Sequence, residues 1–141
     1  MQLAESLAAR LGEDEQAALA ATPGPWRHNA AKMWLPPEDL AQGRTSRGEE
    51  FVAATGGPGP DGECVAATGP ADDPQSMRDA AHIARWGPVR VLSDAAAKRA
   101  VLGALQAAEE WGQDRRDLVY VVRHLAAVYR DHPDYQEEWA P

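Results

Sequence analysis

The 141-residue sequence has few of the residues that build metal clusters, disulfides or membrane spans. Cysteine occurs once, at Cys64, which excludes an internal disulfide and any zinc site built from several thiolates. No stretch approaches the roughly 20 apolar residues of a membrane span, and residues 1–10 show no basic start followed by an apolar run. These absences predict a protein of the reducing cytoplasm, without a membrane span or a secretion signal.

Positive charge is also scarce. The chain has 14 Lys and Arg against 22 Asp and Glu, a formal net charge of -8, and residues 1–70 and 71–141 each carry an acidic excess. Binding to a phosphate backbone depends on clustered Lys and Arg, so we expect no direct nucleic-acid binding. An acidic mimic of nucleic acid, with its carboxylates along one face, stays open as a second alternative function.

The first half of the chain predicts one helix and a small sheet. Leu3, Leu7 and Leu11 recur at helical spacing, and the prolines after Ala20 end that helix. Two short β-capable runs, near 50–55 and 63–68, flank a Gly/Pro-rich connection and predict an antiparallel hairpin. A short irregular strand is expected within 26–35, and Cys64 is expected to be a small buried residue of its strand.

The second half predicts three helices. Asp73 and Pro74 favour a helix start, and Gly87-Pro88 stops that helix. A long helix follows from Val89 to about Trp111 and ends at Gly112. A last helix, capped by Asp114, is expected to continue until His132-Pro133 stops it.

The predicted fold class is α+β: a helix, a small antiparallel β-hairpin or sheet, and three helices packed as one compact domain over residues 1–141. Its parts are an N-terminal helix (1–22), a turn with the small sheet (23–70), a helical part (71–132) and an acidic, aromatic tail (133–141).

Four segments carry a resemblance to a known family. They are ATPGPWRH at 21–28, CVA at 64–66, DDPQSM with DAAHIAR at 72–85, and DHPDY with EEW at 131–139. In their order and spacing they resemble a family of small actinobacterial proteins of unknown function. The helix, the Thr-Pro-Gly-Pro-Trp turn and the small sheet also resemble phage and prophage accessory proteins, which implies descent from a mobile element.

Histidine and acidic residues are the candidates for chemistry. Asp72, Asp73, His28 and His82 would form an active site only if the fold brought them together, because no pair of histidines has the i, i+4 spacing of a helical metal motif. Ser76 and His82 are six residues apart, about 600° of helical rotation, so they form no local dyad. We therefore predict no catalytic residue, no metal and no cofactor.

Tryptophan and arginine are the candidates for binding. We expect most of the five Trp to fill the core, and Trp26 and Trp139 to lie at a contact surface. Positive charge gathers between 78 and 99, and an anion or partner site there would include His82 and Arg85.

The sequence favours a non-enzymatic protein that binds or regulates a protein partner, or that forms a homo-oligomer. A small hydrolase or ligand-binding enzyme using Asp72, Asp73, His28 and His82 is the alternative.

Overall fold

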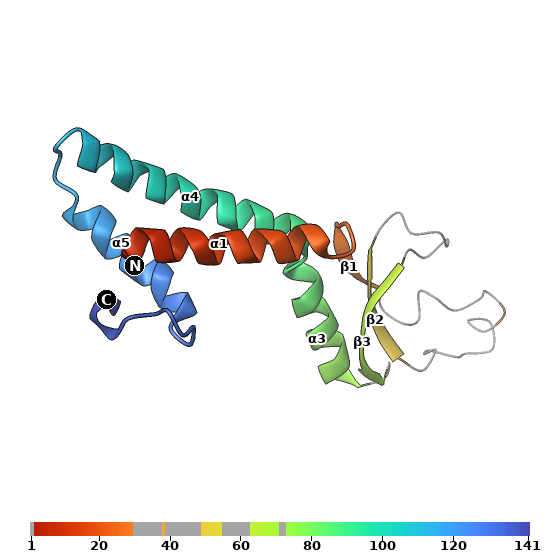
Figure 1. The fold of residues 1–141 in the computed structure, drawn as a ribbon. Coiled ribbons are helices and arrows are strands. Elements are labelled where there is room, and N and C mark those ends of the chain that lie inside the picture. The colour runs from red at the N-terminus through yellow and green to blue at the C-terminus, as the bar shows by residue number, and fades with distance from the viewer. Residues whose placement is uncertain (1, 30–37, 39–48, 55–62, 71–72) are drawn as a thin grey trace. The chain divides into compact units, whose positions relative to one another are not determined.

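The computed structural model describes residues 2–29, 38, 49–54, 63–70 and 73–141 (Figure 1). A helix, a three-stranded antiparallel sheet and three further helices follow one another along the chain, and the predicted α+β class is confirmed. In chain order the elements are α1 (Leu3–Ala20), β1 (Trp26–Asn29), β2 (Glu49–Ala54), β3 (Glu63–Pro70), α3 (Pro74–Arg85), α4 (Pro88–Glu110), α5 (Arg116–Ala126), and the 3-10 turns η2 (Ala127–Tyr129) and η3 (Glu137–Trp139).

The chain forms two compact units, which we describe separately. Met1–Ala17 and Leu92–Pro141 make up the helical unit, and Ala18–Val91 makes up the sheet unit. The single domain over residues 1–141 stays a prediction.

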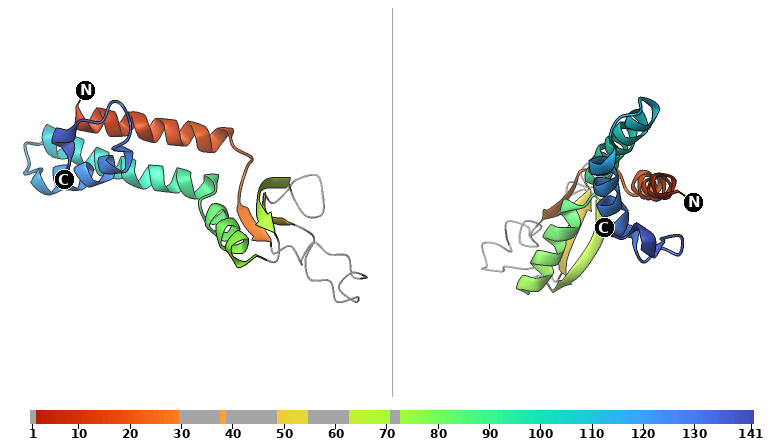
Figure 2. Two further views of the ribbon diagram at one scale, coloured as in Figure 1. Left: turned by 90° about the horizontal axis from the view of Figure 1, so that it is seen from below. Right: turned by 90° about the vertical axis from the view of Figure 1, so that its left-hand side faces the viewer.

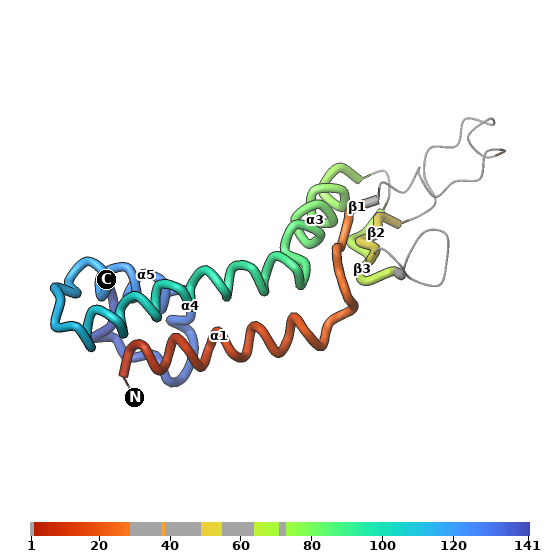
Figure 3. Tube along the Cα trace, turned by 90° about the horizontal axis from the view of Figure 1, so that it is seen from above, coloured from red at the N-terminus to blue at the C-terminus, as the bar shows by residue number. Residues whose placement is uncertain are grey.

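The helical unit is built on helical periodicity. Within it, α1 and α4 run side by side in opposite directions (Figures 1 and 3). Leucines at every fourth position put one face of α1 against α4 and α5, because i and i+4 lie on the same side of a helix. The core is formed by Leu7, Leu11, Ala95, Leu105 and Val122, each at most 5% exposed.

The connection from α4 to α5 follows the predicted turn. Gly112 has a φ of 63°, and the Gln113 N–H donates to the Ala108 carbonyl at 2.8 Å, which closes the helix end. Asp114 Oδ1 accepts from the Arg116 N–H at 3.0 Å, but the N-cap residue of α5 is Arg115, so the predicted cap lies one residue too early. The predicted end of this helix is wrong, because α5 stops at Ala126 and tightens into η2 before the proline is reached.

The sheet unit has α3 packed on a sheet of order β1-β2-β3 (Figure 2). The predicted hairpin of β2 and β3 is confirmed, with two register irregularities along it. The irregular strand predicted within 26–35 is present as β1 over its first four residues, and the remaining positions lie outside the described residues.

The start of α3 also matches the sequence. Asp73 Oδ1 accepts from the Gln75 N–H at 2.9 Å, and Pro74 occupies the first turn. The strand before it approaches α3 closely: Gly69 has a φ of 132°, and a Cβ there would lie 2.5 Å from the buried Ser76 Oγ. Only glycine fits this position.

Candidate functional site

Two of the predicted binding residues, Trp26 and Arg85, line one cavity in the sheet unit. The Trp26 indole N–H donates to the Thr22 carbonyl at 2.8 Å, which fixes the half-buried ring. The ring lies against the corner between α3 and α4, where a Cβ on Gly87 would come within 3.2 Å of it. The cavity is about 220 Å³ and is lined by Pro25, Trp26, Ala84, Arg85, Gly87, Val89 and Arg90.

The guanidinium groups at this cavity have no acidic partner among the residues that the structure describes. Arg90 stacks its guanidinium over the Trp86 ring, 4.1 Å from the ring centroid. Neither Arg85 nor Arg90 forms an ion pair through its side chain with any described residue. The cavity therefore combines apolar walls with two uncompensated positive charges.

His28 belongs to a separate buried pair. Its Nε2 lies 2.9 Å from Glu50 Oε1, and Glu50 is 1% exposed. His28 on β1 stands opposite Val52 on β2, so Glu50 is its diagonal neighbour on the same sheet face. Glu50 could not be predicted as the partner of His28 from the sequence, because the two residues are 22 positions apart and only the register of β1 and β2 brings them together.

The other predicted histidine and aspartates do not join them. His82 is exposed, on the side of α3 away from the buried Ser76 and Ala80. Asp73 serves as the helix cap, and Asp72 lies outside the described residues.

The burial of several tryptophans differs from what the sequence predicts. Trp139 is 6% exposed and packs edge-on against Tyr135, so its predicted place at a contact surface is wrong. Trp86 and Trp111, expected in the core with most of the others, are 44% and 78% exposed. Cys64, expected to be buried, is exposed.

A polar cluster joins the C-terminal segment to α1 in the helical unit, and Figure 2 shows the ribbon of both elements. Arg10 is buried and pairs with Glu13 at 2.9 Å, contacts both ring nitrogens of His132, and reaches Asp134 at 3.5 Å. A guanidinium can only donate, so at most one of the two ring nitrogens of His132 accepts a hydrogen bond from Arg10. These contacts give the DHPDY segment a structural role.

Tyr129 extends this polar cluster. Its hydroxyl donates to Asp14. Burial, followed by the hydrogen bond and negative charge of Asp14, raises the pKa of Tyr129 above its ordinary value. The phenol is therefore held protonated as a structural donor.

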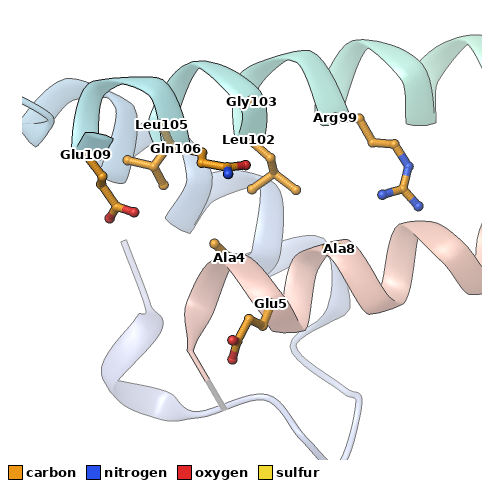
Figure 4. A pocket seen from close by; sticks show the side chains of 9 residues that line it. All are labelled: Ala4, Glu5, Ala8, Arg99, Leu102, Gly103, Leu105, Gln106 and Glu109. Atoms are coloured by element: carbon orange, nitrogen blue, oxygen red, sulfur yellow. The ribbon is translucent and has the colours of Figure 1, made fainter. Parts of the chain in front are cut away.

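An open groove of about 540 Å³ lies between α1 and α4 in the helical unit (Figure 4). It exists because Ala4, Ala8 and Gly103 are small, and a Cβ on Gly103 would meet no atom within 4 Å. Arg99 at its edge makes two 2.7 Å hydrogen bonds to Glu15. The charged edge of the groove is thus already satisfied within the unit.

The outer face of α5 and η2 exposes apolar side chains. Val128, Tyr120 and Val121 are 68%, 61% and 40% exposed, and His124 packs edge-on against the Tyr120 ring, with centroids 4.5 Å apart. The spacing of these four residues puts them on one side of the helix, opposite the buried Val122. We call Tyr120, Val121, His124 and Val128 the α5 face.

Two kinds of site are missing from the described part of the chain. No three His, Cys, Asp or Glu side chains gather there in a way that could hold a metal ion. None of the helices described combines the length and apolar character of a membrane span.

Comparison with known proteins identifies the family of this chain. The model of a family of unknown function (DUF6221) matches residues 1–141. No curated protein and no solved structure matches the chain.

Proposed function

Because the chain belongs to this family of unknown function over its whole length, no activity carries over from relatives, and we propose from its own contacts that it is a non-enzymatic protein-binding protein. It acts by docking the α5 face on an apolar surface of a protein partner. The partner is a second copy of the chain or a different protein, and the two are distinguished by experiment.

The exposure of the α5 face is the observation that carries this proposal. Surface apolar residues are ordinary when they are scattered, but a contiguous set on one helix side is typical of a docking surface. Tyr120 and Val121 lie one turn before His124, and Val128 lies one turn after it, which matches the anchor spacing of a helix that inserts into a groove. The Tyr120–His124 ring contact holds two of these anchors in place.

The placement of charged residues supports this function over the two alternatives. A hydrolase would need His28 and His82 near one another, whereas His28 bonds to buried Glu50 and His82 faces solvent. A nucleic-acid mimic needs free carboxylates, whereas Glu15 and Asp114 each make hydrogen bonds to an arginine.

We further propose a cytoplasmic location and a mobile-element origin in actinobacteria, as the sequence favours. The exposed free thiol of Cys64 suits a reducing compartment, because an exposed thiol is susceptible to oxidation in an oxidising one.

A paired-variant capture experiment tests the function. The double variant Val121→Gln/Val128→Gln removes two anchors of the α5 face with a good helix former. Leu19→Gln removes an apolar residue of α1 that is 72% exposed, close to the 68% of Val128, and serves as the control. Each protein is immobilised on a resin and incubated with an extract of host cells, and the retained proteins are identified. The molar mass of each protein in solution is measured separately by light scattering.

We expect the wild type and Leu19→Gln to retain the same partner or to form the same oligomer, and the double variant to lose it. Surface substitutions of this kind change stability by about 0.5 kcal/mol or less, so melting temperatures should stay close. A wild type that is monomeric and retains nothing beyond what the double variant retains would overturn the proposal.

A further inference from the structure

The cavity beside Trp26 has the size of a single small ring. An engineered apolar cavity of about 150 Å³ binds benzene, and drug-sized ligands occupy about 300 Å³ or more. At about 220 Å³, the cavity lies between these values. Its walls are formed by the Trp26 ring, Pro25, Ala84 and Val89. These side chains are apolar and suit an apolar ligand.

The charge at the rim is of one sign. Arg85 and Arg90 both line the cavity, and neither side chain has an acidic partner among the described residues. The Arg90 guanidinium lies over the Trp86 ring, 4.1 Å from the ring centroid, and a guanidinium held over a ring can still donate hydrogen bonds. Two such groups beside one cavity favour an anionic ligand over a neutral one.

We propose that this cavity binds a carboxylate carried on a compact apolar body, such as an aromatic or branched aliphatic acid. The apolar body occupies the space beside Trp26, and the carboxylate accepts hydrogen bonds from Arg85 and Arg90. A small free acid and the C-terminal residue of a peptide share this chemistry. The site lies in the sheet unit and does not depend on the proposed role of the α5 face.

Nuclear magnetic resonance titration tests the proposal directly. The probes are 3-phenylpropionate, its neutral amide 3-phenylpropionamide, and inorganic phosphate. We expect 3-phenylpropionate to shift the Trp26 indole N–H and the Arg85 and Arg90 Nε–H signals saturably. The amide lacks the charge and phosphate lacks the apolar body, so both should bind at least tenfold more weakly.

Two variants and one control locate the binding site. Arg85→Gln and Arg90→Gln should each weaken 3-phenylpropionate binding about tenfold, because each removes one charge-assisted hydrogen bond. Arg27→Gln changes an exposed arginine that neighbours Trp26 in sequence but does not line the cavity, and should change binding less than twofold. Unchanged amide dispersion in each variant checks that the fold is kept.

Short peptides that end in Phe, with a free or an amidated C-terminus, distinguish a small free acid from a peptide C-terminus as the ligand. A free-acid peptide that binds at least tenfold more tightly than 3-phenylpropionate assigns the site to a protein C-terminus, and equal or weaker binding assigns it to a small acid. The proposal is overturned if 3-phenylpropionate does not saturate, if the amide or phosphate binds equally well, or if Arg27→Gln weakens binding as much as Arg85→Gln.

Discussion

The two units use their arginines differently. In the helical unit, Arg10, Arg99, Arg115 and Arg116 each face a carboxylate, and Arg123 and Arg130 form no ion pair with a described residue. In the sheet unit none of the described arginines faces a carboxylate: Arg78 reaches only Gln75, and Arg27, Arg85 and Arg90 have no acidic partner there. Most arginines of the helical unit are therefore paired within it, whereas the described arginines of the sheet unit are not.

The two units also differ in how closely their helices and strands approach one another. The helical unit leaves an open groove around Gly103, where a side chain would meet nothing. In the sheet unit, Gly24, Gly69 and Gly87 each lie where a Cβ would come within 3.2 Å of a neighbouring atom. The helical unit therefore tolerates change at its surface, and the sheet unit depends on close contacts. The four substitutions below test this difference.

The largest expected effect is in the sheet unit. His28→Ala removes one hydrogen-bond partner of the buried Glu50, and the loss of a hydrogen bond to a buried carboxylate should cost about 3 kcal/mol. His82→Ala, at an exposed position of α3, is the matched control and should cost about 0.5 kcal/mol or less. Urea unfolding measures both, and equal costs would refute the structural importance of the pair.

Gly69→Ala should cost about 2 kcal/mol, because the backbone there has a positive φ and the new methyl meets Ser76 Oγ. Adding Ser76→Ala removes the 2.5 Å contact and leaves one of 3.5 Å, so part of the loss should be recovered. The same unfolding assay with Ser76→Ala alone completes the cycle. A double variant whose losses simply add would show that the contact is not the cause.

A smaller effect is expected in the helical unit. Tyr129→Phe removes the hydrogen bond to Asp14 and should cost about 1 kcal/mol at neutral pH. The pKa of Tyr129 is raised in the folded state, so its contribution is complete below the ordinary tyrosine pKa of about 10 and is lost as the pH rises above that value.

Unfolding at pH 7 and pH 11 measures this dependence. The wild type should lose more stability than the Phe variant between the two values, and Tyr120→Phe, at an exposed ring, should behave as the wild type. An identical pH dependence in wild type and Tyr129→Phe would contradict the account.

The smallest effect has the opposite sign. Gly103→Ala should stabilise the protein by about 0.5–1 kcal/mol, because alanine favours the helix and the methyl points into open space. A rise in melting temperature checks this. A loss of stability would show that the groove between α1 and α4 is closed in solution.

The helices could be predicted where local signals coincide. Leu3, Leu7 and Leu11 with the following prolines gave the bounds of α1, and Asp73 with Pro74 gave the start of α3. The predicted end of α5 was wrong because the change from an α-helix to a 3-10 turn has no sequence signal as strong as a proline.

The site could be predicted only in part, because it depends on contacts between distant segments. Trp26 and Arg85 were both named, but their common cavity needs the turn before β1 to meet the corner after α3. Trp139 was predicted at a contact surface because it lies in the C-terminal tail, whereas it is 6% exposed and packs against the Tyr135 ring. Periodicity along one element contains none of this information.

Photo-crosslinking is the most direct test of the central claim, that the α5 face binds a protein. A benzophenone side chain is introduced at Val128 in one protein and at Leu19, on α1, in another, and both are irradiated in living cells. The account predicts one crosslinked adduct of defined mass from position 128 and none from position 19. The mass of this adduct shows whether the partner is a second copy of the chain or a different protein. No adduct at position 128, or the same adducts from both positions, would contradict the account.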